Sequence, residues 1–157
     1  MSARTGIGYD SHRLGAGETL ILGGVTIEHE RGTVAHSDGD VLTHAVIDAL
    51  LGAAGLGDIG QHFPDTDTLF AGADSLALLR EAVALARGAG WAPTFADTTL
   101  VCQRPKLGPH RDAMREALVA ALGADVNVKF TTGEEIGFVG REEGIAAHAV
   151  VTVDSAR

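Results

Sequence analysis

The segment from about Asp40 to Ala54 constrains the fold most, because it reads as a single amphipathic helix with a defined end. Its apolar residues recur at the i, i+3, i+4 spacing of one buried stripe, and they are Leu42, Ala45, Val46, Ala49, Leu50 and Ala53. Gly55 and Gly57 follow, and glycine commonly ends a helix. The stripe must be buried against another layer, so the chain has to supply a sheet or a further helix beside it.

Strand-like and helix-like segments alternate along the rest of the chain. Strands are expected at Thr5–Asp10, Thr94–Cys102, Val126–Thr131 and Ile145–Val153, with a small hairpin from Thr19–Leu22 and Val25–Ile27. Further helices are expected from about Ser75 to Arg87, and from near Pro109 to Gly123. This order favours an α/β (α+β) fold, with a single mixed β-sheet and helices packed on one face, in one domain over residues 1–157. The other sheet face must then be covered, which suggests an oligomer.

Charge and cysteine content exclude several classes of protein. The net charge of −9 argues against a nucleic-acid binder, because such a protein needs a clustered basic face. Cys102 is the only cysteine, so neither a disulfide framework nor a cysteine metal site is expected. The chain shows no signal-peptide pattern and no apolar run of about 20 residues. We therefore expect a cytoplasmic protein without a membrane partner.

Three side chains are of residue types that commonly bind a metal ion together. Asp10 and His12 lie two residues apart at the end of the first predicted strand, so they point to the same side. His44 lies on the long helix, with Asp40 and Asp48 four residues to either side in a polar stripe. Two imidazoles and a carboxylate are a common set of ligands for catalytic zinc. Asp40 or Asp48 is then the expected carboxylate that orients a ligating ring.

Each of these residues also has a simpler interpretation. The pattern Asp-x-His occurs by chance, and a helical histidine is most often just solvated or hydrogen-bonded. Asp40 can favour the helix N-terminus through the helix dipole alone. Spacing by itself therefore leaves the metal site and these ordinary roles both open.

A second group of residues is suited to phosphate. The long stretch Gly57–Ala73 is of a length that is usually functional inside a compact domain. Hydroxyl and backbone N–H groups at Thr131-Thr132-Gly133 can hold phosphate oxygens, and Glu134 can hold a hard cation such as Mg²⁺. A small basic cluster is formed by Arg104, Lys106 and Arg111. Strand propensity, turn chemistry and a solvated surface explain the same residues without a ligand.

Six motifs occur in one order over essentially the whole chain. They are Gly8-Tyr9-Asp10-Ser11-His12, Ala35-His36-Ser37-Asp38-Gly39-Asp40-Val41, Asp48-Ala49-Leu50-Leu51-Gly52-Ala53, Gly57-Asp58-Ile59-Gly60, Phe63-Pro64-Asp65-Thr66-Asp67 and Gly137-Phe138-Val139-Gly140-Arg141. Each motif is weak alone, but the ordered set is specific. The chain resembles the 2-C-methyl-D-erythritol 2,4-cyclodiphosphate synthase family of the non-mevalonate isoprenoid pathway.

The resemblance implies a lyase and assigns its residues. The enzyme would convert 4-diphosphocytidyl-2-C-methyl-D-erythritol 2-phosphate into the cyclic diphosphate and CMP. It would hold Zn²⁺ on Asp10, His12 and His44, and Mg²⁺ or Mn²⁺ near Glu134 and the substrate diphosphate. The methylerythritol phosphate part would be bound by His36, Ser37, Asp58, Ile59, Gly60, Phe63, Pro64, Asp65, Thr66 and Asp67. Asp10, Ser11, His12, Gly133 and Glu134 would also contact the substrate. The cytidine and its phosphates would be bound by Cys102, Gln103, Arg104, Pro105, Lys106, Leu107, Gly108, Thr131 and Thr132. His36 and Thr132 would stabilise the transition state.

The resemblance also implies a homotrimer whose sheets face the three-fold axis, with active sites between neighbouring subunits. Phe138, Arg141 and Glu143 would lie near that axis, where an isoprenoid diphosphate can bind. No role is assigned to His148. Two other functions share these residues. One is a metal-dependent phosphohydrolase, and the other is a non-catalytic trimer that binds isoprenoid diphosphates.

Overall fold

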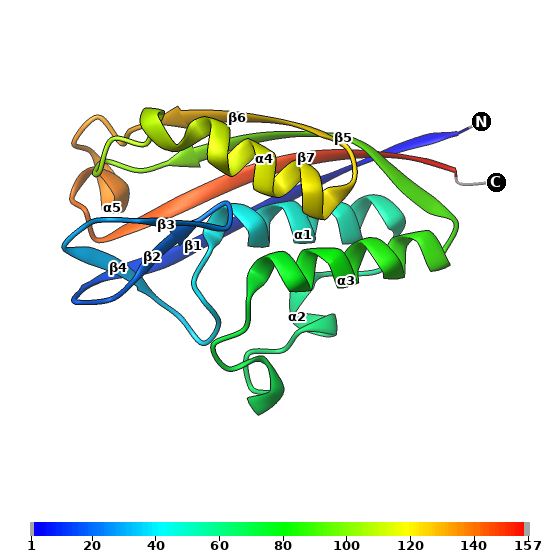
Figure 1. Cartoon of the computed structure of the whole chain (residues 1–157), viewed down its shortest axis with the longest axis horizontal. Coiled ribbons are helices and arrows are strands. Elements are labelled where there is room, and N and C mark those ends of the chain that lie inside the picture. Colours follow the sequence, from blue (N-terminus) through cyan, green and yellow to red (C-terminus); the bar gives the residue numbers. More distant parts are fainter. Residues whose placement is uncertain (1, 156–157) are drawn as a thin grey trace.

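The computed structural model describes residues 2–155 and contains one five-stranded mixed sheet in the order β4-β1-β7-β5-β6 (Figure 1). The strands are β1 (Ala3–Ala16), β4 (Arg31–Val34), β5 (Trp91–Val101), β6 (Asp125–Thr131) and β7 (Gly144–Ser155). All neighbours are antiparallel except β5 and β6, which are parallel. A separate two-stranded sheet pairs β2 (Leu20–Leu22) with β3 (Val25–Ile27). The expected mixed sheet and hairpin are confirmed.

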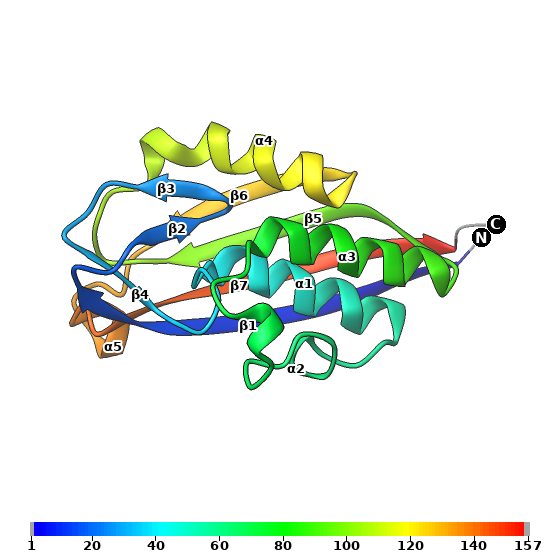
Figure 2. The same ribbon diagram turned by 60° about the horizontal axis from the view of Figure 1, so that its bottom comes forward.

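The long helices all lie on one face of the large sheet (Figure 2). They are α1 (Val41–Ala54), α3 (Ser75–Gly88) and α4 (Arg111–Leu122). Short helical turns occupy the loops, namely α2 (Ile59–His62), η1 (Thr68–Phe70), η2 (Gly108–His110) and α5 (Gly137–Gly140). The core lies between the sheet and these helices. Among residues 2–155, no helix is both long and apolar enough to cross a bilayer.

Helix α1 is not the half-exposed amphipathic helix that its sequence suggests. It packs on β1 and β7 and is covered by α3, so nearly every residue of it is buried. The expected polar stripe is therefore wrong, because Asp40 is fully buried, His44 is 9% exposed and only Asp48 is partly open to solvent. Polar residues on this helix must find partners inside the protein.

Several expected boundaries also differ from the structure. Strand β1 extends to Ala16 rather than ending at Asp10, because it pairs with β7 along its length and then with β4. Strand β4 was not expected, since its four residues show little alternation. The predicted loop 57–73 contains α2 and η1, which are too short to give a periodic signal. Pro109 lies in η2, and α4 begins at Arg111.

Two glycines allow α1 to lie directly on β1. A Cβ atom on Gly6 would overlap the carbonyl oxygen of Ala49, and one on Gly8 would overlap that of Ala45. Backbone can approach backbone this closely only where no side chain intervenes. The glycines therefore bring α1, and with it His44, against the strand that carries Asp10 and His12.

Within residues 2–155, the opposite face of the sheet is uncovered. Ile7 and Val150 are paired neighbours on β1 and β7, and they are 72% and 40% exposed. Tyr9 and Phe95 are also large exposed side chains, with Tyr9 next to His148 on the neighbouring strand. Apolar residues gathered on a sheet face of this kind usually mark a surface that contacts another molecule.

Candidate metal centre

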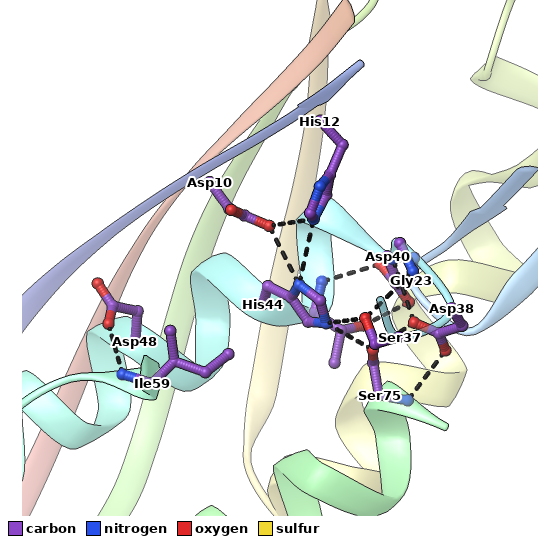
Figure 3. A network of polar contacts seen from close by, with 12 residues as sticks. Asp10, His12, Gly23, Ser37, Asp38, Asp40, His44, Asp48, Ile59 and Ser75 are labelled. Atoms are coloured by element: carbon purple, nitrogen blue, oxygen red, sulfur yellow. Dashed lines mark hydrogen bonds and ion pairs between the residues drawn. The ribbon is translucent and has the colours of Figure 1, made fainter. Parts of the chain in front are cut away.

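Asp10, His12 and His44 converge on one point, although they lie on different elements (Figure 3). The Oδ2 atom of Asp10 is 3.0 Å from Nε2 of His12 and 3.1 Å from Nδ1 of His44. The two ring nitrogens are 3.5 Å apart. Asp10 and His12 point the same way along β1, as their spacing predicted, and α1 brings His44 to meet them. The expected ligand set is thus brought together.

The three donors form an electrostatically coupled group. Burial raises the pKa of Asp10, but the hydrogen bonds and positive charge of His12 and His44 outweigh it and hold that pKa at about 2. Burial lowers the pKa of His44, but the hydrogen bond to Asp10 and the charges of Asp10, Asp40 and Asp38 outweigh burial and raise it. The pocket therefore stabilises positive charge beside Asp10, which is the charge that a bound cation also carries.

The other nitrogen of His44 faces the opposite direction. Its Nε2 atom is 2.7 Å from Oγ of Ser75, the first residue of α3, and 3.3 Å from Oγ of Ser37. Ser75 in turn donates to the carboxylate of Asp38 through both its hydroxyl and its backbone N–H. The expectation that Asp40 or Asp48 orients the ring is therefore wrong.

Asp40 and Asp48 have structural roles instead. Asp40 caps α1 and accepts hydrogen bonds from the backbone N–H groups of Gly23, Gly24 and Thr43 and from the Thr43 hydroxyl. Burial raises the pKa of Asp40, and these hydrogen bonds act against it. Asp48 accepts from the N–H of Ile59 and so ties the start of α2 to α1. Both side chains position the segments around the site without facing His44.

A cavity of about 270 Å³ opens beside the metal residues. Most residues predicted to bind the methylerythritol phosphate part line it, namely His36, Ser37, Ile59, Gly60, Phe63, Pro64 and Asp65. Ala35, Phe70 and Leu78 line it too and were not expected. Phe70 packs edge-on against Phe63. Of these three residues, only Phe70 could have been predicted from the sequence, because it is an aromatic residue close to the motif that contains Phe63.

Four predicted residues lie outside this cavity. Asp58 and Asp67 cap α2 and η1 with their carboxylates, and the carbonyl oxygen of Asp67 is 3.0 Å from Nε2 of His36. Thr66 is exposed between them. Ser11 lines a separate hollow, together with Phe138 and Glu143. Asp58 and Asp67 therefore shape the wall of the cavity without lining it.

A second cavity of about 350 Å³ contains most of the residues predicted for the nucleotide. It is lined by Cys102, Gln103, Pro105, Lys106, Leu107, Gly108, Pro109, Arg111, Phe130, Thr131 and Thr132. Phe130 was not expected, and its ring lies under the guanidinium of Arg111 at 4.9 Å. Burial raises the pKa of the Cys102 thiol to about 12, so the thiol is uncharged where it lines the cavity.

The remaining predicted residues lie apart from both cavities. Arg104 is exposed, and the backbone N–H groups of Gly133 and Glu134 bond to Gln103 and Thr132. Glu134 is exposed and does not join the Asp10 cluster. Arg141 pairs with Glu143 at 3.5 Å near α5. The two cavities share no lining residue, so the described chain does not by itself unite the metal site with the nucleotide pocket.

The donor set suits a divalent cation. One carboxylate oxygen and two imidazole nitrogens lie within 4.8 Å of one another, and this is a set that zinc and similar ions accept. The atoms face a cavity rather than the core, so a further position remains accessible to a substrate oxygen. These residues therefore form a site that can hold a divalent ion.

The chain is similar to a set of known proteins over nearly its whole length. The YgbB family model matches residues 3–154. A curated 2-C-methyl-D-erythritol 2,4-cyclodiphosphate synthase of Ectopseudomonas mendocina (strain ymp) is 59% identical over 150 residues, which cover 94% of this chain and 96% of that protein.

Solved structures of the same kind superimpose closely. The bifunctional IspDF from Campylobacter jejuni is 43% identical with a TM-score of 0.94, covering 98% of this chain and 42% of that chain, so this chain spans less than half of that protein. A 2C-methyl-D-erythritol-2,4-cyclodiphosphate synthase in its CDP-bound form is 43% identical with a TM-score of 0.88, covering 96% of this chain and all of that one.

Proposed function

The chain belongs to the YgbB family, and from that membership and the convergence of Asp10, His12 and His44 we propose how it closes a cyclic diphosphate at this site. The reaction converts 4-diphosphocytidyl-2-C-methyl-D-erythritol 2-phosphate into 2-C-methyl-D-erythritol 2,4-cyclodiphosphate and CMP. The enzyme is a phosphorus–oxygen lyase of the non-mevalonate isoprenoid pathway. The observation that carries the site assignment is the meeting of three ligand atoms at the mouth of a cavity.

The chemistry of this reaction needs no activated serine or cysteine. An oxygen of the 2-phosphate attacks the β-phosphorus of the same molecule, a new phosphorus–oxygen bond forms, and the bond from the β-phosphorus to the α-phosphate oxygen breaks. CMP leaves with that oxygen and its electrons. The nucleophile is already an anion, so the barrier comes from charge repulsion and from folding a flexible chain back on itself. Positioning alone can supply up to about 7–11 kcal/mol in ideal cases.

We assign zinc to Asp10, His12 and His44, and Mg²⁺ or Mn²⁺ to Glu134 and the substrate diphosphate. A bound cation neutralises charge that develops on the phosphate oxygens. Asp10, His12 and His44 would hold the first ion where β1 meets α1. Glu134 offers an exposed carboxylate, and its backbone N–H bonds to Thr132, a residue of the nucleotide cavity. Oxygen donors of this kind suit a hard cation that bridges phosphates.

His36 and Thr132 are the proposed stabilisers of the transition state. Nε2 of His36 contacts the carbonyl oxygen of Asp67, which only accepts, so this nitrogen carries a proton. His36 also lines the first cavity, and a ring carrying protons on both nitrogens would donate from Nδ1 to a phosphate oxygen there. Thr132 lines the other cavity. The Arg111 guanidinium there adds positive charge for the nucleotide phosphates, and a CDP-bound relative supports this use of the pocket.

We propose that the protein works as a homotrimer whose sheets face the three-fold axis. The exposed apolar residues on the open face, including Ile7 and Val150, support this assembly. The separation of the two cavities supports active sites shared between subunits, each with the metal residues of one chain and the nucleotide cavity of its neighbour. Phe138 and Arg141 would lie at the axis, where an isoprenoid diphosphate can bind. The substrate is a nucleotide, and we place the enzyme in the cytoplasm.

The decisive experiment is a product assay with the linear substrate, followed by phosphorus NMR. Cyclic diphosphate and CMP in equal amounts support the proposed site. Free inorganic phosphate would indicate the phosphohydrolase instead, and no turnover with retained binding of an isoprenoid diphosphate would indicate the non-catalytic trimer. The same assay after removal of divalent ions by a chelator, and again after adding Zn²⁺ and Mg²⁺ separately, tests the assignment of the two metal sites.

A further inference from the structure

Ser75 is a polar residue that the reaction does not use and that no motif singled out. It is the first residue of α3, follows the N-cap Asp74, and is fully buried. Its hydroxyl lies 2.7 Å from Nε2 of His44, far from it in sequence, on the side of the ring that faces away from Asp10 (Figure 3). A buried hydroxyl placed against a proposed metal ligand can set how that ligand is presented.

The direction of the hydrogen bonds follows from what Asp38 can accept. A carboxylate accepts hydrogen bonds and donates none, and a serine hydroxyl has a single proton. Ser75 points its hydroxyl at one oxygen of Asp38, while its backbone N–H donates to the other at 2.9 Å. The Ser75 hydroxyl therefore donates its proton to Asp38. Toward His44, the hydroxyl oxygen of Ser75 can then act only as an acceptor.

The consequence for His44 is a fixed tautomer. Because Ser75 accepts from Nε2, that nitrogen carries the proton, and the neutral ring keeps its lone pair on Nδ1. Nδ1 is the atom that faces Asp10 at 3.1 Å and His12 at 3.5 Å. Ser37 provides only a longer contact to Nε2, at 3.3 Å, and its hydroxyl also accepts from the N–H of Gly39.

We propose that Ser75, held by Asp38, is a positioning residue that commits His44 to bind the metal through Nδ1. The pair works from the N-terminus of α3, so a third element helps to build a site whose ligands lie on β1 and α1. This inference rests on the proposed metal site. It adds a residue that acts through His44 and that touches neither substrate nor ion.

The test compares Zn²⁺ affinity, by competition with a chromophoric chelator, across matched variants of the full chain. Ser75→Ala is expected to weaken binding by about 10–100-fold. Asp38→Asn should also weaken it, because an amide that donates to Ser75 turns the hydroxyl proton toward His44 and favours the tautomer with Nδ1 blocked. Asp74→Ala is the matched control, since it removes the cap of α3 one residue away and leaves the His44 contact intact.

A second measurement distinguishes positioning from general loosening. Two-bond proton–nitrogen NMR of the metal-free protein, at a pH where the ring is neutral, should show only the Nε2–H tautomer of His44. Ser75→Ala should show both tautomers, and Asp74→Ala only the first. Equal affinity losses in Ser75→Ala and Asp74→Ala, or an unchanged tautomer in Ser75→Ala, would overturn the proposal.

The outcomes also separate this inference from the metal site itself. Wild-type protein that binds no divalent ion would overturn the metal site and the role of Ser75 together. Wild-type protein that binds Zn²⁺ while Ser75→Ala binds it equally well overturns only the role of Ser75. Circular dichroism melts report whether each variant folds. If Ser75→Ala does not fold, the Zn²⁺ affinity and the His44 tautomer measured in Asp38→Asn test the role of Ser75 instead.

Discussion

The Oδ2 atom of Asp10 lies 3.1 Å from Nδ1 of His44, and this contact joins strand β1 to the buried helix α1. Each group alters the ionisation of the other. Asp10 has its pKa held at about 2 against burial, and His44 has its pKa raised against burial. The same geometry that pairs these charges in the metal-free protein leaves both donors ready for a cation, so protons and metal compete for one site.

Substituting Asp10 by asparagine should lower the pKa of His44, because burial then acts with less opposition. In wild type, the raised pKa of His44 contributes stability below pH 6.5 that is lost as pH rises through the folded value. The lowered pKa of Asp10 contributes stability above pH 3.8 that is lost as pH falls toward 2. Urea midpoints of metal-free wild type and Asp10→Asn should therefore differ more at about pH 5 than at about pH 9. An equal difference at both would contradict the coupling.

His44→Ala should abolish metal binding and turnover while the protein stays folded. The substitution removes one of three donors, and two donors hold zinc far more weakly. Metal content after dialysis and the release of CMP measure the two effects, and a circular dichroism melt checks the fold. His29→Ala, a histidine in the loop after β3 and outside both cavities, is the control and should keep its metal. Retained activity without zinc would refute the ligand assignment.

Gly8→Ala should destabilise the protein and weaken metal binding together. Its new methyl group would overlap the backbone of α1 at Ala45, one residue from His44. Moving α1 away costs about 3 kcal/mol of unfolding free energy and separates His44 from Asp10. Gly52→Ala is the matched control, because within residues 2–155 nothing beyond the adjacent backbone of α1 lies within 4 Å of its added Cβ, and helical alanine is favoured by about 1 kcal/mol. Chemical denaturation and zinc titration of both variants test this. A Gly8→Ala protein as stable as wild type would show that α1 can move away from β1 without loss of stability.

Glu134→Gln should weaken the second cation more than the first. The amide keeps the size of the side chain but removes the charge that attracts Mg²⁺ or Mn²⁺, while the Asp10, His12 and His44 cluster does not include this residue. Titrating Mn²⁺ by electron paramagnetic resonance in the presence of CDP, and Zn²⁺ by chelator competition, measures the two sites separately. Parallel losses at both sites would show that Glu134 does not belong to the second site alone.

Ile7→Asp should break the proposed trimer without unfolding the chain. Ile7 is 72% exposed on the open face of the sheet, opposite Val150, so a charge there is tolerated in the monomer but not in an apolar interface. Light scattering measures the mass of the assembly, and CMP release should fall with it if the site is shared. Leu69→Asp, at an exposed apolar residue in η1, should leave the mass unchanged. A trimer that survives Ile7→Asp would place the interface elsewhere.

The secondary-structure elements that could be predicted are those long enough to show a repeating pattern of residues. The helix at 41–54 follows from apolar periodicity, and the shared direction of Asp10 and His12 follows from their spacing on a strand. Strand β4 and the turns α2 and η1 left no such pattern, because each is too short to repeat. The polar stripe on α1 was misjudged because exposure depends on what packs around a helix, and α3 covers the side that the sequence left open.

The amino-acid sequence by itself determined which residues can bind a metal and which segments carry them, since ligand chemistry and helix or strand preference reside in single residues and their near neighbours. Tertiary structure alone decided that His44 turns Nδ1 toward Asp10 and Nε2 toward Ser75. It also decided that Asp40 caps α1 and ties it to the hairpin, away from the ring of His44. These choices depend on contacts between residues 16 to 34 positions apart. Such contacts arise only when elements pack together and every buried polar group needs a partner.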